Sequence, residues 1–286
     1  MLTMTRGNEC VFFYPEKKAF TSKAEILKFL EINIINISTY AKLEGGVGSM
    51  SVIFLCGGAG KRLRPLTQNC PKALVDVAGT CLLVKNIQKA IRVGETSFYI
   101  CAGYKYEKFL SFFDNLLEKI DDYHYSGYID NIKINAYIDV LPVDVGTGKR
   151  LSSVFEHYSI EDDIYICYSD IYSDIDWGVF KEYKEMCMLA VPNRSQYGLL
   201  RLAPNNRIKT FMEKPIFSEE WINGGIFFLK NMVKNNIVNS ADSFEKDILP
   251  LLVQNIECYA IKYRGVWFSM DSLKDFHAIE MEISQK

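Results

Sequence analysis

The stretch VIFLCGGAGKRLRPLT, residues 52–67, decides the fold, and PK follows it at residues 71–72. Its first five residues are apolar, which is typical of a fully buried strand. Three glycines come within the next four positions, so the backbone can bend sharply and lie against a ligand with no Cβ in the way. The segment therefore predicts a buried strand that ends in a ligand-binding loop.

The loop carries charge of one sign. Residues 57–75 include four cations and no Asp or Glu, although the whole chain has a formal net charge of −2. Such a loop beside a buried strand focuses positive potential, so we expect a polyanionic ligand. Two familiar phosphate motifs do not fit, because Leu63 stands where the dinucleotide fingerprint needs glycine and Arg62 where the Walker loop needs Ser or Thr.

The loop resembles the signature of the sugar-1-phosphate nucleotidylyltransferases, G-G-x-G-[ST]-R-L-x-P-L-T followed by P-K, and departs from it at Lys61. The resemblance covers about residues 50–283. It implies that Arg62 and Lys72 are catalytic and neutralise phosphate groups. It also implies nucleotide contacts from Leu55, Gly57, Gly58, Gly60, Lys61 and Arg62. The alternative is a strand-to-helix turn with a solvated basic face.

Composition limits the class of protein. With 286 residues, of which 49% are hydrophobic, the chain can bury a large core. Its eight cysteines show no C-x-x-C pair, and no secretory signal opens the sequence, so we expect reduced thiols in the cytoplasm and no zinc. No apolar run is long enough to cross a bilayer, and charge is nearly balanced, so we expect neither a membrane nor a nucleic-acid partner. A homo-oligomer is left open.

Residues 50–286 form the predicted nucleotidylyltransferase domain, and residues 1–49 are an N-terminal extension whose role stays open. The alternation of apolar runs and helical stretches predicts an α/β fold, a mainly parallel sheet with helices on both faces. The resemblance implies that this Rossmann-like sheet is of the nucleotide-diphospho-sugar transferase type. We expect strands at 51–56, 97–102, 132–138, 163–168, 187–192, 224–229 and 257–262. We expect helices at 80–92, 105–119, 148–157, 176–185, 243–254 and 272–283. Ligands of such sheets bind beyond the carboxyl ends of the strands.

The segment VGTGKRL, residues 145–151, opens a predicted helix with two glycines and a hydroxyl. Free N–H groups at a helix start can bind a base edge or a phosphate. The family has a base-recognition element here, which implies that Thr147, Gly148 and Arg150 bind the nucleotide. Arg before Leu is typical of the cytidylyltransferase branch, yet a guanidinium can donate to cytosine or to guanine. A capping turn with an exposed Arg is the alternative.

Two acids are candidate metal ligands. Asp170 ends the apolar run IYICYS, and a carboxylate at the end of a sheet strand is placed to hold Mg²⁺ together with substrate phosphates. GVWFSMDSL, residues 265–273, resembles the glucose-1-phosphate cytidylyltransferase branch and implies Asp271 as the second ligand. The alternatives are a turn-forming Asp at 170 and a helix N-cap at 271.

The motifs FMEKP, residues 211–215, and WINGGI, residues 221–226, resemble the family's E-K-P and N-x-G segments. They imply that Glu213, Lys214, Asn223 and Gly224 bind the sugar phosphate. A solvated ion pair at a strand end is the alternative for the first two. We interpret SFEKDILP, residues 243–250, as a structural helix, and the three histidines fall outside every motif.

The reaction implied is transfer from a nucleoside triphosphate, with CTP favoured, to a sugar 1-phosphate, with release of pyrophosphate and with Mg²⁺ as cofactor. The attacking phosphate oxygen is already anionic, so no general base is required. Guanylyl transfer to a hexose or heptose 1-phosphate is the alternative within the family. A nicotinamide-dependent oxidoreductase and a non-catalytic sensor are the alternatives from other classes.

Overall fold

The computed structural model describes residues 51–129, 132–237 and 241–285. The predicted extension 1–49 lies outside the described residues. Among the described residues, no helix is long and apolar enough to cross a membrane.

Strand β1 (Ser51–Leu55) lies in the middle of a nine-stranded sheet with the order β14-β10-β13-β8-β1-β4-β7-β6-β5. It pairs in parallel with β4 (Ser97–Ala102) and with β8 (Ile164–Tyr168), and β4 pairs in parallel with β7 (Ile132–Val140). The carboxyl ends of these strands therefore meet at one edge of the sheet. Strands β13 and β6 run opposite to the others, so the predicted mainly parallel sheet is confirmed in a mixed form.

Strand β1 is buried on both faces. Val52 and Phe54 pack into one apolar cluster, and Ile53 and Leu55 pack into the other. Alternate side chains of a strand point to opposite faces, which is why a continuous apolar run suits this position. Burial of each such side chain stabilises the fold by about 1.5–3 kcal/mol relative to exposure.

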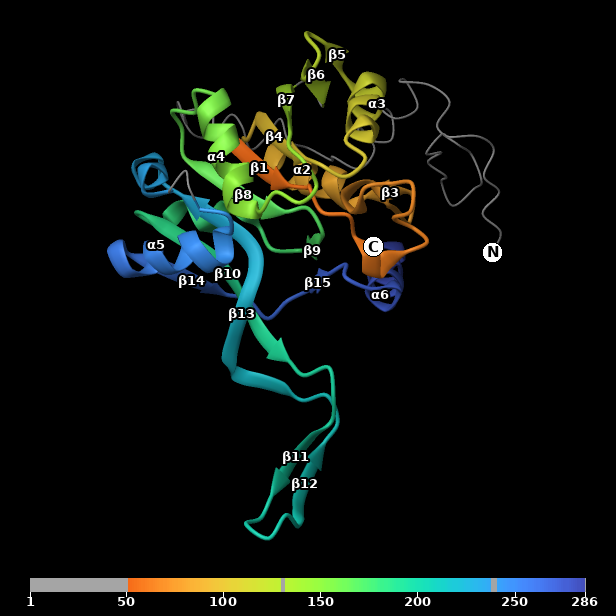
Figure 1. Cartoon of the computed structure of the whole chain (residues 1–286), viewed down its shortest axis with the longest axis vertical. Coiled ribbons are helices and arrows are strands. Elements are labelled where there is room, and N and C mark those ends of the chain that lie inside the picture. Colours follow the sequence, from red (N-terminus) through yellow and green to blue (C-terminus); the bar gives the residue numbers. More distant parts are fainter. Residues whose placement is uncertain (1–50, 130–131, 238–240, 286) are drawn as a thin grey trace.

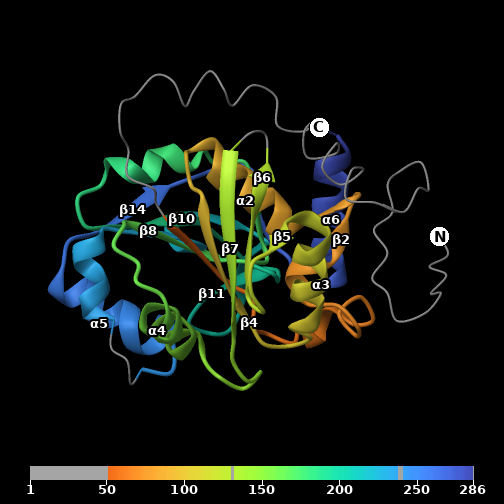
Figure 2. The same ribbon diagram turned by 90° about the horizontal axis from the view of Figure 1, so that it is seen from above.

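Helices cover both faces of the sheet, as predicted (Figure 2). One face is covered by α2 (Leu82–Arg92), α3 (Glu107–Leu116) and α6 (Leu273–Ser284), and the other by α4 (Thr147–His157) and α5 (Leu249–Asn255). The remaining elements are η2 (Lys61–Leu63), η3 (Lys72–Leu74), β2 (Asp76–Val77), β3 (Thr80–Cys81), β5 (Glu118–Lys119), β6 (His124–Ile129), β9 (Ile171–Ser173), η5 (Asn231–Asn236), β14 (Cys258–Lys262) and β15 (Trp267–Ser269).

Three predicted helices differ from the structure. The helix expected at 105–119 ends at Leu116, and the helix expected at 176–185 is the short 3₁₀ helix η4 (Trp177–Glu182). The helix expected at 243–254 is divided into the π-helix η6 (Phe244–Ile248) and α5. Pro250 lies in the first turn of α5, where its missing N–H group is tolerated, so the division follows from the sequence.

An arm projects from the sheet (Figure 1). Strands β10 (Met186–Arg194) and β13 (Ile216–Leu229) pair antiparallel and are longer than predicted, and they lead to a hairpin of β11 (Leu199–Leu202) and β12 (Ile208–Met212). The sequence analysis missed this hairpin. Its apolar side chains do not enter the core, because Leu200 and Phe211 are 48% and 61% exposed.

Candidate active site

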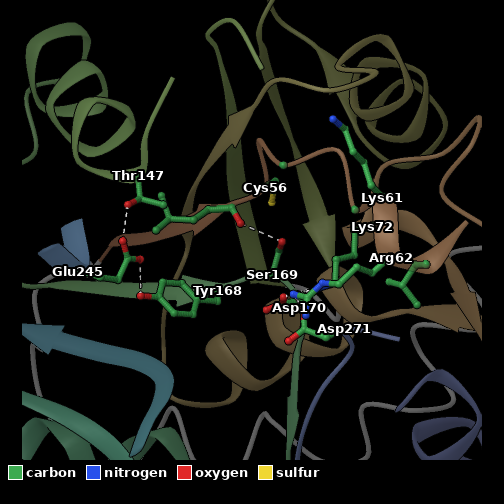
Figure 3. A pocket seen from close by; sticks show the side chains of 14 residues that line it. Cys56, Lys61, Arg62, Lys72, Thr147, Tyr168, Ser169, Asp170, Glu245 and Asp271 are labelled. Carbon is green, nitrogen blue, oxygen red and sulfur yellow. Dashed lines mark hydrogen bonds and ion pairs between the residues drawn. The ribbon is translucent and has the colours of Figure 1, made fainter. Parts of the chain in front are cut away.

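A pocket of about 430 Å³ opens at the carboxyl edge of the sheet (Figure 3). Its wall is built from the ends of β1 and β8, the glycine-rich loop, the start of α4, η6 and the segment after β15. The lining residues are Leu55, Cys56, Gly58, Gly60, Lys61, Arg62, Leu63, Lys72, Thr147, Tyr168, Ser169, Asp170, Glu245 and Asp271. This volume is in the range of small-molecule sites.

The glycine-rich loop is fixed by contacts on both sides. Gly60 adopts a left-handed conformation with φ of 56°, and its carbonyl accepts a hydrogen bond of 2.7 Å from the Thr67 hydroxyl. Tyr104 holds the two ends, because its N–H group donates to the Gly57 carbonyl and its hydroxyl donates to the Gln68 carbonyl. The loop is thus shaped before any ligand binds.

The two predicted metal ligands converge on Lys72. The Lys72 Nζ atom lies 2.5 Å from Asp170 Oδ2 and 2.8 Å from Asp271 Oδ1, and Arg62 Nη2 lies 3.1 Å from the same Asp271 oxygen (Figure 3). Strand pairing explains this meeting of distant segments, because β15 pairs with β9 and brings Asp271 beside the strand end that carries Asp170. Lys72 therefore contacts both acids, and Arg62 contacts Asp271.

The environment of Asp271 keeps it ionised. Burial alone would raise the pKa of Asp271, but the ammonium of Lys72 and the guanidinium of Arg62 more than offset this, and the pKa lies below its ordinary value. The alternative of Asp271 as a helix N-cap is wrong. Ser272 caps α6, and its capping box with Asp275 leaves the Asp271 carboxylate free to face the pocket.

The acid pair fits a magnesium ion. Mg²⁺ takes oxygen ligands and is commonly held by one or two carboxylates together with phosphate oxygens and water. Asp170 and Asp271 supply two carboxylates that lie close together, because both contact the same Lys72 Nζ atom. In the part of the chain that the structure describes, no group of three or more His, Cys, Asp or Glu residues could hold a metal by itself. A Mg²⁺ ion held by these two acids would take its other ligands from phosphate oxygens and water.

Arg150 does not line the pocket. It is 3% exposed, and its guanidinium donates to three main-chain carbonyls, those of Ala102, Pro142 and Val145. It lies directly beneath Gly57, where any side chain would collide with it. Burial lowers the pKa of Arg150. The alternative of an exposed arginine is wrong, and the structure assigns this side chain to the support of the loop.

The start of α4 is closed by the chain itself. The Thr147 hydroxyl donates to Glu245 at 2.7 Å and accepts from the Phe244 N–H group, and the Gly148 N–H group donates to the Asp242 carbonyl at 2.8 Å. A Cβ atom on Gly148 would lie 2.7 Å from the Ala241 carbonyl. The glycine at the helix start thus permits close approach of residues 241–242. Thr147 lines the pocket, whereas the Gly148 N–H group is used within the fold.

The four predicted sugar-phosphate residues do not line the pocket. Asn223 is exposed and donates to the hydroxyl of Tyr168, a pocket residue, at 3.3 Å, and the Gly224 carbonyl accepts from the Trp267 indole. Glu213 and Lys214 lie between β12 and β13 and form an exposed ion pair of 3.4 Å. The structure therefore brings together the loop, Lys72 and the acids but does not bring Glu213 and Lys214 to them.

Sequence reasoning missed five pocket residues, the apolar Cys56 and Leu63 and the polar Tyr168, Ser169 and Glu245. Ser169 donates to the Leu55 carbonyl and so links the ends of β8 and β1. Glu245 lies in the segment SFEKDILP, which the sequence analysis interpreted as structural. An acid in the first turn of that segment was the available signal, but only the fold reveals that it faces the pocket.

The fold and the site are those of an enzyme that transfers a nucleotidyl group, and the chain belongs to the nucleotidyl transferase family, whose model matches residues 51–286. The resemblance to sugar-1-phosphate nucleotidylyltransferases is thereby confirmed, and with it the class of enzyme.

Two relatives and one solved structure are similar to this chain. A glucose-1-phosphate cytidylyltransferase of Salmonella typhimurium is 29% identical over 240 residues, which are 79% of this chain and 93% of that protein. A putative mannose-1-phosphate guanyltransferase of Sulfolobus acidocaldarius is 26% identical over 82% of this chain and 63% of its own length. The solved structure of the CTP:phosphocholine cytidylyltransferase of Streptococcus pneumoniae shares the fold, with 18% identity, a TM-score of 0.55 and coverage of 82% of this chain and all of its own.

Proposed function

We propose that this protein joins CTP and a sugar 1-phosphate to give a CDP-sugar and pyrophosphate, with Mg²⁺ as cofactor. The observation that carries the proposal is the contact of Lys72 with both Asp170 and Asp271 beside the cationic loop. This arrangement suits a reaction in which two anions must approach each other.

A phosphate oxygen of the sugar phosphate attacks the α-phosphorus in line. The new P–O bond forms while the bond from the α-phosphorus to the bridging oxygen breaks, and pyrophosphate leaves with the electron pair. Arg62 and Lys72 neutralise the crowded phosphates, and the glycine-rich loop aligns them. A Mg²⁺ ion held by Asp170 and Asp271 would neutralise the departing pyrophosphate when bound. Because Glu213 and Lys214 lie away from the pocket lining, their assignment to the sugar phosphate rests on the resemblance alone.

CTP is favoured by the motifs around Arg150 and Asp271 and by the Salmonella relative, which acts on the cytidylyl group. Guanylyl transfer to a hexose or heptose 1-phosphate is the second candidate, supported by the GTG segment at 146–148 and by the Sulfolobus relative. Arg150 does not choose between them, since main-chain carbonyls occupy its guanidinium. The described cysteines are free thiols, and reduced thiols are typical of cytoplasmic proteins. We therefore propose that the protein works in the cytoplasm.

The decisive experiment measures pyrophosphate release with four nucleoside triphosphates against a panel of sugar 1-phosphates, with Mg²⁺ or with EDTA. We expect the largest kcat/KM with CTP and no release with EDTA. A larger value with GTP would favour the second candidate. Absence of release from every pair would contradict both.

A further inference from the structure

The pocket has two ends of different chemistry (Figure 3). At one end, Arg62 and Lys72 meet the two acids. At the other, the carboxylate of Glu245 lies beside Thr147 and Tyr168, with Ser169 between the two ends. A ligand that fills the pocket therefore meets cations at one end and an uncompensated acid at the other.

Glu245 is held firmly but keeps a free acceptor site. Its Oε1 atom accepts a hydrogen bond of 2.6 Å from the Tyr168 hydroxyl, and its Oε2 atom accepts from Thr147 at 2.7 Å and Ser243 at 3.0 Å. A carboxylate has about four acceptor positions, so one remains on Oε1. No ion pair joins Glu245 to a cation among the described residues.

The carboxylate is ionised in neutral solution. Burial alone would raise the pKa of Glu245, but the donated hydrogen bonds from the Tyr168, Thr147 and Ser243 hydroxyls outweigh it, and the pKa lies below its ordinary value. An anion fixed in this way repels phosphate and attracts hydrogen-bond donors.

The wall around Glu245 extends toward β13. The Tyr168 hydroxyl accepts from Asn223 Nδ2, so Glu245, Tyr168 and Asn223 form one hydrogen-bonded row from η6 through the end of β8 to β13. In the sheet order β13-β8-β1, this row reaches the side of β8 away from the glycine-rich loop. We therefore expect this hydrogen-bonded row to contact the part of the ligand that lies farthest from the glycine-rich loop.

We propose that Glu245 binds hydroxyl groups of the transferred sugar and determines which sugar 1-phosphate the enzyme accepts. This inference rests on the proposed function, which places a sugar phosphate in the pocket. A sugar offers several neutral hydroxyl donors, and the free acceptor site of Oε1 with its neighbouring hydroxyls provides complementary partners.

The test compares wild type with Glu245→Gln, which preserves the size of the side chain and removes its charge. Loss of a charge-assisted hydrogen bond is expected to raise KM for the sugar 1-phosphate about ten- to a hundredfold and to leave KM for the nucleoside triphosphate within about twofold. Glu182→Gln, at an exposed acid of η4 outside the pocket lining, is the matched control and should change neither constant.

Deoxy sugar 1-phosphates identify the hydroxyl. The analogue that lacks the hydroxyl bound by Glu245 should be a poor substrate of the wild type. The substitution Glu245→Gln should not raise the KM for this analogue any further. Tyr168→Phe, which keeps the ring and removes one donor to Glu245, should raise the KM for the sugar 1-phosphate by a smaller factor. This variant decides the question if Glu245→Gln fails to fold.

Two results overturn the inference while leaving the proposed function intact. They are a normal KM for the sugar phosphate in folded Glu245→Gln and a change confined to the KM of the nucleotide. A wild type that prefers phosphocholine, whose cation would pair with Glu245, or that releases no pyrophosphate with any sugar 1-phosphate overturns the proposed function, and the inference falls with it.

Discussion

Lys72 contacts two acids that lie 98 and 199 residues away in sequence. Replacing it with alanine removes the cation that lies between the two carboxylates, where we propose that the two phosphates of the substrates meet. Loss of one such stabilising group costs about a hundred- to a thousandfold in kcat. We therefore expect Lys72→Ala to lower kcat for pyrophosphate release by at least about a hundredfold.

Steady-state assays measure this effect, and circular dichroism and thermal unfolding check the fold. Lys119→Ala is the matched control, because Lys119 is an exposed lysine of β5 whose ion pair is with Asp122. Near-normal turnover of folded Lys72→Ala would remove Lys72 from the chemistry.

Arg150 leads to a prediction about stability. Lysine cannot reproduce a guanidinium that donates to three separate carbonyls, and a buried carbonyl left without a donor is costly. We expect Arg150→Lys to lower the free energy of unfolding by about 2–3 kcal/mol in urea denaturation. If Arg150 reads the base instead, the variant will unfold like wild type and will differ in its ratio of CTP to GTP turnover.

The sequence predicted the charged residues that gather at the cationic end of the pocket better than it predicted their surroundings. Arg62, Lys72, Asp170 and Asp271 follow from motifs whose chemistry is local. The position of Arg150 does not, because its three carbonyl partners come from the end of β4, from the loop after β7 and from the segment just before α4. Glu245 was missed for the same reason, since two of its three hydroxyl donors come from α4 and β8.

At the level of elements, α4 shows why glycine occurs at a helix start. Intrinsic propensity favours alanine over glycine inside a helix by about 1 kcal/mol. In α4 the opposite is expected, because a Cβ atom on Gly148 would lie 2.7 Å from the Ala241 carbonyl. We expect Gly148→Ala to lower the free energy of unfolding by about 1–3 kcal/mol, as overpacking does.

Urea denaturation measures the difference. Glu156→Ala is the control, because Glu156 is an exposed residue of the same helix and its change should stay within about 0.5 kcal/mol. If Gly148→Ala is as stable as wild type, the contact between α4 and residues 241–242 does not constrain the helix.

The sequence placed the central strands well because their apolar runs are continuous. It missed β6, the hairpin β11–β12 and the short strands β2, β3, β5, β9 and β15. In the hairpin, Leu200 pairs with Phe211 and both side chains remain largely exposed, so burial gives these strands no clear pattern. A two-stranded hairpin that projects from a domain is specified by pairing between strands, which periodicity alone does not reveal.

For the whole molecule, the class of fold was predictable and the order of strands was not. The alternation of strands and helices indicates a parallel sheet, but placement of β8 beside β1 and of β15 beside β9 depends on long crossovers. These two pairings bring Asp170 and Asp271 to the loop after β1. The site is therefore a property of the topology, although each of its main residues is visible in a local motif.

Global stability should depend on one buried acid outside the pocket lining. Glu95, between α2 and β4, is fully buried, and Lys181 Nζ lies 2.9 Å from one of its oxygens. Burial raises the pKa of Glu95 from its ordinary value of 4.5 to about 7, although Lys181 opposes the rise. Between these pH values the folded protein holds a proton that the unfolded chain has lost.

The free energy of unfolding must therefore fall as pH rises from about 4.5 to 7, by about 3 kcal/mol from this group. Glu95→Gln has no carboxyl group to titrate, so we expect its stability to improve relative to wild type across this range. Urea denaturation of both proteins at pH 5, 6, 7 and 8 gives the comparison. The amide also leaves Lys181 without a carboxylate partner. This loss changes the free energy of unfolding of the variant by an amount that does not depend on the titration of Glu95. The change of the difference with pH is therefore the quantity to measure, and a constant difference would mean that Glu95 titrates near its ordinary value despite its burial.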